Sequence, residues 1–447
     1  MLAKFARDLA YRVYQRYKPA LAAGYRAEGA RAASAFSRCV ALTDGGRLDE
    51  ARACYETLLE MEPSNALACN NLGIIHQGQG APAKAAALFH EAIRLDPSRP
   101  QPYVNLGNVL QDDRDLAGAL LQYDAAIRLD PALPSARYGR ATALLALGRF
   151  EEGWRDFEWR AHFSGALARQ DLHPKRWDGS QAIAGKRILL RAEQGFGDTL
   201  QFVRYASLVA ARGGEVSVEC PRPLASLLRT VPGVRTVIAA GEPLPDCDYE
   251  IALMSLPLAF ATSAESIPAS VPYVEADAGA VADWHARLGA HCDGLKVGIA
   301  WSGNPTPAAA QHARSLPVEY LADLTCLRGC TFFSLQKGDA SKEAAMLRKR
   351  GVNLHDFTSD LNNFSDTAAH ISALDVVVSV DTAVAHLAGA LAKPAFVALP
   401  FSADWRWRAS GAATPWYPTM RLFRQPAPGD WRHVVEELKR ALEARVA

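Results

Sequence analysis

The sequence has no strong net charge, no long apolar run and no paired-cysteine motif. Its 49 Lys and Arg residues balance 48 Asp and Glu residues, so the formal net charge is only +1. A chain this neutral offers no electrostatic field for nucleic acid. The longest apolar stretch, Ile251–Ala261, contains Ser255 and Pro257 and is too short to cross a bilayer. We therefore expect neither a nucleic-acid partner nor a transmembrane segment.

Cysteine occurs eight times, and no two cysteines form a C-x-x-C pair. Cys326 and Cys330 are close together but have no second pair or nearby histidine, which argues against zinc. No D-x-D motif stands at the end of a predicted strand in the α/β part of the chain, so we expect no metal site. Scattered thiols fit small apolar packing in a reducing compartment, and the predicted localisation is cytoplasmic.

The opening stretch, MLAKFARDLAYRVYQRYK, breaks every apolar run with Lys, Arg or Asp and has no signal-peptide core. We expect a basic helix within residues 1–30. Such a helix could make peripheral contact with an anionic membrane surface. The alternative is a solvated cap for the segment that follows it.

A period of 34 residues organises the next part of the chain. It is carried by Leu72 and Leu106, Gly73 and Gly107, Tyr55, Phe89, Tyr123 and Phe157, Ala51, Ala85, Ala119 and Gly153, and Pro63, Pro97 and Pro131. Small residues let paired helices approach closely, aromatic residues fill the space between neighbours, and proline ends each second helix. One unit of this kind cannot bury its apolar face alone, so several must stack.

This pattern of N-L-G, alanine, an aromatic residue and a closing L-D-P resembles the tetratricopeptide repeat over roughly Arg31–Arg160. Stacked repeats would form a groove lined by the first helix of each repeat. Asn71 and Asn105 recur along it, and Gly139 takes the next position. Asparagine can hold an extended peptide backbone, as it does in the protein glycosyltransferases whose asparagine ladders this pattern resembles. The alternative is ordinary polarity on a helix surface.

After residue 185 short β-rich runs alternate with helices, which is typical of parallel sheets. Predicted strands are Lys186–Arg191, Glu215–Cys220, Leu295–Trp301, Thr331–Leu335, Asp375–Ser379 and Ala395–Leu399, and Asp430–Val446 reads as a final helix. The run of Pro, Gly and charge in Asp171–Gly185 marks a linker. The predicted domains are a cap (1–30), about four repeats (31–166), a linker (167–185), a first lobe (186–290) and a second lobe (291–447).

Two motifs follow strands in these lobes. The first lobe has I-L-L-R-A-E-Q-G-F-G-D-T, and the second has V-V-V-S-V-D-T-A-V-A-H-L-A-G-A-L-A-K-P. Together they resemble the inverting heptosyltransferase-like glycosyltransferases of family 9. With S-L-Q-K-G and P-W-Y-P-T-M-R-L-F-R-Q, the likeness is closer still to bacterial glycosyltransferases that carry tetratricopeptide repeats. The resemblance implies an α plus α/β fold, a helical solenoid followed by a GT-B type pair of Rossmann-like lobes.

The resemblance makes Asp198 the candidate base that takes the acceptor proton, with Glu193 as the reserve candidate. The alternative for Asp198 is a role in capping the helix that follows. Gly195 and Gly197 would let the loop backbone approach a ligand closely.

Donor binding is assigned to the second lobe. The helix opened by Asp381, Thr382 and Ala383 presents free N–H groups to a diphosphate, and His386 follows one turn later. Asp381 itself repels phosphate, so it would cap the helix or hold a ribose or a cation. Where heptosyltransferases have D-T-G, this chain has Ala383. Ser302 is a further donor-binding candidate, and it opens the stretch Ser302–Arg314. In the family that this chain resembles, the corresponding loop commonly carries a lysine that binds phosphate, and this chain has none there. Lys337 and Arg314 are the cations that could take its place.

An aromatic and basic cluster lies near the end of the chain. Trp405, Arg406, Trp416 and Tyr417 are candidates for sugar or acceptor contact, because aromatic faces stack on sugar rings and arginine binds anions. Packing between the lobes is the alternative.

These residues predict an inverting, metal-independent hexosyl- or heptosyltransferase. It needs no cofactor beyond a nucleotide-sugar co-substrate. The expected acceptor is a protein or peptide recruited by the repeats, for example flagellin or another surface protein. The alternatives are a transferase for lipopolysaccharide or another surface glycan, and a non-catalytic repeat scaffold.

Overall fold

The structure of the 447-residue chain is a computed structural model that describes residues 30–164, 175–292, 294–303, 314–349 and 351–446. All of the predicted cap except Ala30 lies outside this range. The chain divides into two compact units, which are Met1–Leu147 with Arg155–Phe163, and Gly148–Trp154 with Ser164–Ala447.

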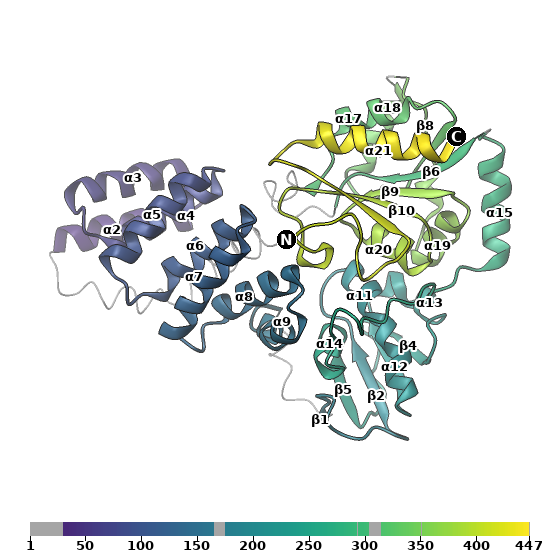
Figure 1. Cartoon of the computed structure of the whole chain (residues 1–447), viewed down its shortest axis with the longest axis horizontal. Coiled ribbons are helices and arrows are strands. Elements are labelled where there is room, and N and C mark those ends of the chain that lie inside the picture. The colour runs from purple at the N-terminus through teal and green to yellow at the C-terminus, as the bar shows by residue number, and fades with distance from the viewer. Residues whose placement is uncertain (1–29, 165–174, 293, 304–313, 350, 447) are drawn as a thin grey trace. The chain divides into compact units, whose positions relative to one another are not determined.

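The first unit is built from consecutive helices that pack in pairs (Figure 1). The helices are α2 (Ala30–Asp44), α3 (Leu48–Met61), α4 (Ala66–Gly78), α5 (Pro82–Leu95), α6 (Pro100–Asp112), α7 (Leu116–Leu129), α8 (Pro134–Leu147), the last part of α9 (Phe150–Phe157) and the start of α10 (Ala161–Ser164). The predicted stop signals are confirmed, because α5 ends two residues before Pro97 and α7 ends two residues before Pro131.

The 34-residue period reflects contacts between glycine and aromatic rings. A Cβ on Gly73 would stand 2.6 Å from Cε1 of Phe89, and one on Gly107 would stand 2.7 Å from Cε1 of Tyr123. Both rings are buried, so the space that each needs is provided by the missing side chain of the first helix. The spacing of glycine and aromatic residues therefore encodes how the helices of each pair pack.

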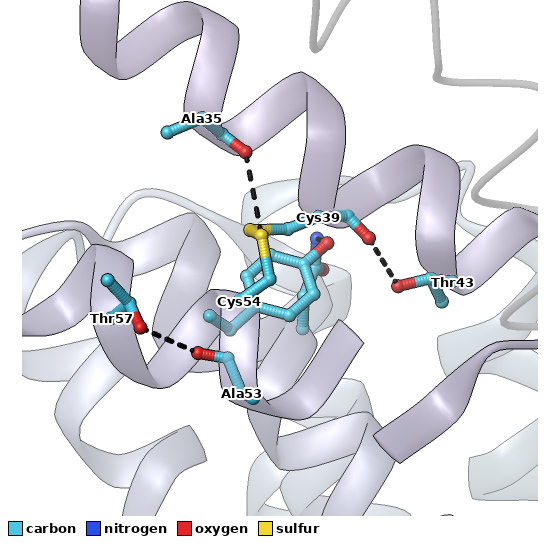
Figure 2. Close-up of a disulfide and its surroundings, with 8 residues drawn as sticks. Ala35, Cys39, Thr43, Ala53, Cys54 and Thr57 are labelled. Atoms are coloured by element: carbon cyan, nitrogen blue, oxygen red, sulfur yellow. Dashed lines mark hydrogen bonds between the residues drawn. A yellow bond between two sulfur atoms is a disulfide. The ribbon is translucent and has the colours of Figure 1, made fainter. Parts of the chain in front are cut away.

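A disulfide joins the helices of the first pair. Cys39 of α2 and Cys54 of α3 are bonded through their sulfur atoms, with Cα atoms 5.4 Å apart (Figure 2). The expectation of scattered, unpaired thiols is wrong for these two residues, because antiparallel packing brings positions 15 apart in sequence to the same level. The other cysteines are free, namely Cys69, Cys220, Cys247, Cys292, Cys326 and Cys330.

The second unit contains two parallel sheets. The first has the order β1-β5-β2-β3-β4, built from β1 (Lys175–Arg176), β2 (Arg187–Arg191), β3 (Glu215–Cys220), β4 (Val234–Ala239) and β5 (Tyr249–Ala252). Its main helices are α11 (Phe196–Phe202), α12 (Ala206–Ala211), α13 (Ala225–Leu228) and α14 (Leu256–Ala259). Ile188, Leu189 and Leu190 of β2 are all buried, as expected of a strand covered on both faces.

The second sheet has the order β11-β10-β9-β6-β7-β8. Its strands are β6 (Leu295–Ala300), β7 (Cys330–Ser334), β8 (Leu354–Asp356), β9 (Val376–Val380), β10 (Ala395–Leu399) and β11 (Met420–Arg424). Its helices are α15 (Ala278–Gly289), α17 (Val318–Thr325), α18 (Ser341–Lys349), α19 (Phe364–Ser372), α20 (Ala383–Ala390) and the predicted final helix α21 (Trp431–Val446). Both sheets reverse strand order beside their first long strand, at β2/β5 and at β6/β9, as doubly wound nucleotide folds do. The predicted fold class, a helical repeat solenoid followed by two Rossmann-like lobes, is confirmed.

The lobes differ from the predicted ranges at three places. Strand β1 and buried Trp177 belong to the first lobe although they fall within the predicted linker, whose residues 167–174 lie outside the described part of the chain. Helix α15 packs on α19 of the second lobe, where Trp284 stacks on His370 with ring centroids 4.3 Å apart. Trp154 of α9 belongs to the second unit.

Candidate functional site

The start of α20 lies at the carboxyl end of β9, where the sequence placed the donor-binding motif. Thr382 is the N-cap of α20, and its Oγ1 accepts the N–H of Val384 at 3.2 Å. The same oxygen lies 3.0 Å from Oγ of Ser379. Ala383 is therefore the first residue of the helix, and the hydroxyl of Thr382 already serves the backbone and a neighbouring serine.

The glycine loop after β2 leads into α11. Asp198 Oδ2 accepts the N–H of Gly195 at 2.8 Å. The alternative interpretation expected Asp198 to precede the helix as its N-cap, but the N-cap of α11 is Gly195 and Asp198 is the third residue of the helix, from which its side chain bonds back to the N-cap. Gly195 is exposed, and the reserve base Glu193 is half-buried in the same loop. Gly197 faces the other lobe, because a Cβ at this position would lie 2.7 Å from Cδ2 of His386. The absence of a side chain at 197 thus allows α11 to contact α20.

Arg406 joins the two lobes at this contact. It lies in the short 3-10 turn Trp405–Trp407 of the second lobe, and its Nη2 forms a buried ion pair with Oδ1 of Asp198. Its Nε donates to Oε1 of Gln201 at 2.8 Å, and its Nη1 donates to Oδ1 of Asp404 at 2.9 Å. Burial alone would lower the pKa of Arg406, but Asp404 and Asp198 outweigh that effect and raise it. The guanidinium is therefore a permanent charge held between two carboxylates.

Asp381 and His386 complete the buried cluster. Burial and the nearby charge of Asp404 raise the pKa of Asp381, against the opposing effect of Arg314, whose Nη1 is 4.0 Å from Oδ2 of Asp381. Burial lowers the pKa of His386 to about 3, so its ring is neutral, and Nδ1 lies 2.9 Å from the hydroxyl of Tyr417. Any donor contact from His386 would come from a neutral imidazole.

A cavity of about 490 Å³ opens beyond the carboxyl ends of β7 and β8 in the second lobe. It is lined by Lys337, Gly338, Ser341, Arg348, Asp356, Thr358 and Ser359. The ammonium of Lys337 donates to the carbonyl oxygens of Thr358 and Leu361, both at 2.8 Å, which leaves one of its three N–H donors.

Ser302 is buried beside β6, and its N–H donates to Oε1 of Gln336 at 2.9 Å. Gln336 also accepts the N–H of Trp301 and returns a bond to the carbonyl of Ser302 at 3.0 Å. Sequence reasoning missed this glutamine, although it stands inside the S-L-Q-K-G motif. Residues 304–313, which follow in the sequence, lie outside the described range.

The aromatic cluster near the chain end is buried. Trp405, Trp416 and Tyr417 are each no more than 2% exposed, so the packing interpretation accounts for their present surroundings. Arg204, which sequence reasoning also missed, lies among them. It donates to the carbonyl of Trp416 at 2.6 Å and to the hydroxyl of Tyr273 at 2.8 Å, and no carboxylate is among the partners found for it in the described residues. Two buried arginines thus cross between the lobes, one from each side.

The predicted asparagines of the repeat unit are engaged with other side chains. Asn71 donates to the hydroxyl of Tyr55 at 3.0 Å, and Asn105 is buried and donates to Oδ1 of Asn70 at 2.8 Å. Asn70 and Asn105 therefore tie α4 to α6. The pairing was not visible in the 34-residue period, because Asn70 has Val104 at its repeat position.

The part of the chain that the structure describes contains no group of three or more His, Cys, Asp and Glu side chains placed to hold a metal ion. Within the same residues, no helix is both long and apolar enough to cross a membrane.

Fold and site together define a protein of helical repeats combined with an α/β unit of two Rossmann-like lobes, which meet at a buried ionic cluster. For the repeat part, a comparison with protein families agrees. The tetratricopeptide repeat family model matches residues 40–100 and 104–153. Protein FlbA of Caulobacter vibrioides is 33% identical over 334 residues, which are 68% of this chain and 54% of FlbA. The chain thus spans about half the length of this relative.

Two solved structures of low sequence identity were also matched. The glycosyl transferase family 9 protein of Veillonella parvula is 9% identical and has a TM-score of 0.46, covering 60% of this chain and 99% of its own. The O-GlcNAc transferase mutant of Thermobaculum terrenum is 16% identical and has a TM-score of 0.36, covering 94% of this chain and 92% of its own.

Proposed function

We propose that the protein is an inverting glycosyltransferase that moves a sugar from a nucleotide-sugar donor, held by the second lobe, to an acceptor hydroxyl. One observation carries the proposal. Asp198, at the glycine loop of the first lobe, meets Arg406 of the second lobe beside the contact between α11 and α20. A candidate base and the predicted donor-binding helix therefore share one buried junction.

The donor fits the second lobe by its chemistry. Ligands of doubly wound sheets bind at the carboxyl edge where strand order reverses, and Ser302 and Thr382 follow the two strands that flank this point. The start of α20 supplies a positive dipole end for a diphosphate. The cavity beyond β7 and β8 adds Lys337 and Arg348 as cations and several hydroxyl groups, a set that suits phosphate and ribose. Its lining also includes the carboxylate of Asp356, 3.7 Å from Arg348.

The reaction would be a single displacement. The oxygen of the acceptor hydroxyl attacks the anomeric carbon while the bond from that carbon to the diphosphate oxygen breaks. Asp198 accepts the hydroxyl proton, and the diphosphate leaves with its new charge stabilised by backbone amides and basic side chains. A carboxylate has about four lone-pair sites, so Asp198 can bind Gly195 and Arg406 and still accept this proton. The positive charge comes from the protein, and no metal ion is required.

A protein acceptor, such as flagellin or another surface protein, is the first candidate because repeat units commonly bind extended peptides. One observation favours a surface glycan instead. The amide of Asn105 is buried against Asn70, so it is not displayed for a peptide backbone.

A ligand screen of the full chain tests the proposal. ADP-heptose, UDP-N-acetylglucosamine, GDP-mannose and CMP-sialic acid would each be added in thermal-shift and calorimetric measurements. One nucleotide class should raise the Tm, because a ligand that binds only the folded state at about 100 times its Kd adds about 2.7 kcal/mol of stability. If no nucleotide or nucleotide sugar binds, the scaffold alternative replaces the enzyme.

The base is tested with the donor that binds. Asp198→Asn should abolish release of the nucleoside diphosphate while donor binding remains. Glu193→Gln is the matched control from the same loop. Loss of activity only in the Glu193 variant would move the role of base to that residue.

A further inference from the structure

Arg406 uses all three guanidinium nitrogens within the lobe junction. Nη1 is bonded to Asp404 in its own turn, while Nε and Nη2 are bonded to Gln201 and Asp198 on α11 of the opposite lobe. Since Gln201 lies one turn after Asp198, the two contacts fix both the position and the rotation of this helix turn relative to the guanidinium. A planar fork with several donors gives this kind of geometric control, which a lysine cannot reproduce.

The surroundings of Arg406 leave it little freedom. Its side chain is 6% exposed, and the guanidinium lies over the ring of Trp405 at 4.5 Å from the centroid. Trp405 is in turn held by Trp154, whose ring centroid is 5.4 Å away. Rotation of the guanidinium would break three polar bonds and this stacking contact together.

The carboxylate of Asp198 is held from two sides. The N–H of Gly195 binds Oδ2 and Arg406 binds Oδ1, so its plane is set jointly by its own loop and by the other lobe. The groups that face the arginine are Asp198 and Gln201 from α11, Asp404 from its own turn, and Asp381, with neutral His386 nearby. Without Arg406, the carboxylates of Asp198 and Asp404 would each lose the cation that they now contact.

We propose that Arg406 is the positioning residue of the reaction: it holds the carboxylate of Asp198 in the orientation that accepts the acceptor proton and ties this orientation to the docking of the two lobes. The inference rests on the proposed function, because it assigns Arg406 a role through Asp198. Arg406 itself does not take part in proton transfer.

Arg204 provides a matched control. It is as deeply buried as Arg406 and crosses the same junction in the opposite direction, but its partners are carbonyl oxygens and the hydroxyl of Tyr273. A variant of Arg204 should therefore cost stability at the junction without disturbing a carboxylate.

The experiment measures donor turnover and Tm of four full-length variants: Arg406→Ala, Arg406→Lys, Arg204→Ala and Asp198→Asn. The donor is the nucleotide sugar that raises the Tm of the unmodified protein most. We expect Arg406→Ala to lower kcat at least tenfold per folded molecule with donor KM within about threefold. Arg406→Lys should recover only part of the loss. Added guanidinium ion should raise kcat of Arg406→Ala several-fold and leave Asp198→Asn unchanged. Arg204→Ala should lower Tm while kcat per folded molecule stays within about twofold.

Two outcomes separate the inference from the function on which it rests. If Asp198→Asn is inactive but Arg406→Ala loses no more kcat than Arg204→Ala and does not respond to guanidinium, Arg406 is only a structural tie and the inference is overturned. If Asp198→Asn keeps full turnover, the base lies elsewhere and the inference about Arg406 is overturned with it. If no nucleotide sugar binds, the proposed function itself fails.

Discussion

Gly197 lies so close to His386 that a single methyl group does not fit between them: a Cβ on Gly197 would stand 2.7 Å from Cδ2 of the imidazole. The ring cannot move aside easily, because it stacks on Trp407 and is bonded to Tyr417. We predict that Gly197→Ala separates α11 from α20, destabilises the second unit by about 1–3 kcal/mol and lowers activity strongly.

Gly289 supplies the control for this substitution. It lies at the end of α15, and among the described residues no atom stands within 4 Å of the position that a Cβ would take there. Gly289→Ala should therefore leave stability within about 0.5 kcal/mol or raise it slightly. Chemical denaturation of both variants measures the effect. Equal stability of the two would show that the contact at Gly197 does not constrain the lobes.

His370 should make the protein sensitive to mild acid. Burial lowers its pKa from 6.5 to about 4, its ring stacks on Trp284, and neither ring nitrogen has a hydrogen-bond partner within the described residues. The unfolded chain therefore binds the proton more readily, so stability is lost as pH falls from above 6.5 towards 4. The expected loss from this residue between pH 7 and pH 5 is about 2 kcal/mol.

A phenylalanine at position 370 would keep the stacking and remove the titration. Urea denaturation of His370→Phe at pH 7 and pH 5 should therefore show a smaller loss than that of the unmodified protein. His386, whose pKa is lowered to about 3, adds an effect of the same sign in both proteins. An unchanged pH dependence in the variant would contradict the assignment to His370.

The Cys39–Cys54 disulfide should stabilise the repeat unit. It closes a loop of 15 residues, for which the loss of chain entropy in the unfolded state corresponds to about 3 kcal/mol. Reducing agent, or Cys39→Ala, should lower the unfolding midpoint of this unit, and reductant should then have no further effect on the variant.

The exposed free thiol of Cys326 provides the control, because Cys326→Ala should change neither the midpoint nor its response to reductant. Thiol titration of the denatured, unreduced chain gives an independent answer. Titration of all eight cysteines would show that the bond is not present.

Asn105→Ala distinguishes two roles for the repeat asparagines. If the side chain serves mainly to tie α4 to α6, its loss leaves the buried Oδ1 of Asn70 without its donor, while Nδ2 of Asn70 keeps its bond to Asn71, and costs about 1–3 kcal/mol. If it binds acceptor, the Tm stays the same and the acceptor KM rises. Denaturation and acceptor kinetics on the same preparation decide between them, with Asn71→Ala as the half-buried comparison.

Four strands that the sequence predicted differ in burial and length from two that it missed, β1 and β8. Strands β2, β6, β9 and β10 are runs of buried apolar residues, which a local pattern shows directly. In contrast, β1 is the exposed dipeptide Lys175–Arg176 and β8 is three residues long. Both strands lie at the edge of a sheet, and each is a strand because it forms hydrogen bonds with the one strand beside it. A local sequence pattern does not show which distant strand will supply those bonds.

The site shows the same division. The cap at Thr382 and the glycine loop around Asp198 follow from short motifs. The pairing of Asp198 with Arg406 spans 208 positions and depends on how the two lobes dock. Sequence reasoning placed Arg406 near a ligand because of its aromatic neighbours, whereas its partner turned out to be the candidate base.

The position of Trp154 decides where the chain can be divided. Its indole donates to the carbonyl of Thr262 at 3.0 Å and packs beside Trp405 and Trp416 in the interior of the second unit. Removal of every residue with the repeat signature would therefore remove Trp154 from the core of the α/β unit. It would also expose Trp405 and Trp416, the rings that Trp154 contacts. A separately expressed α/β unit should therefore begin no later than Gly148. In the same way, an exchange of repeats between two proteins that combine repeats with an α/β unit should succeed only when the exchanged segment ends before Gly148.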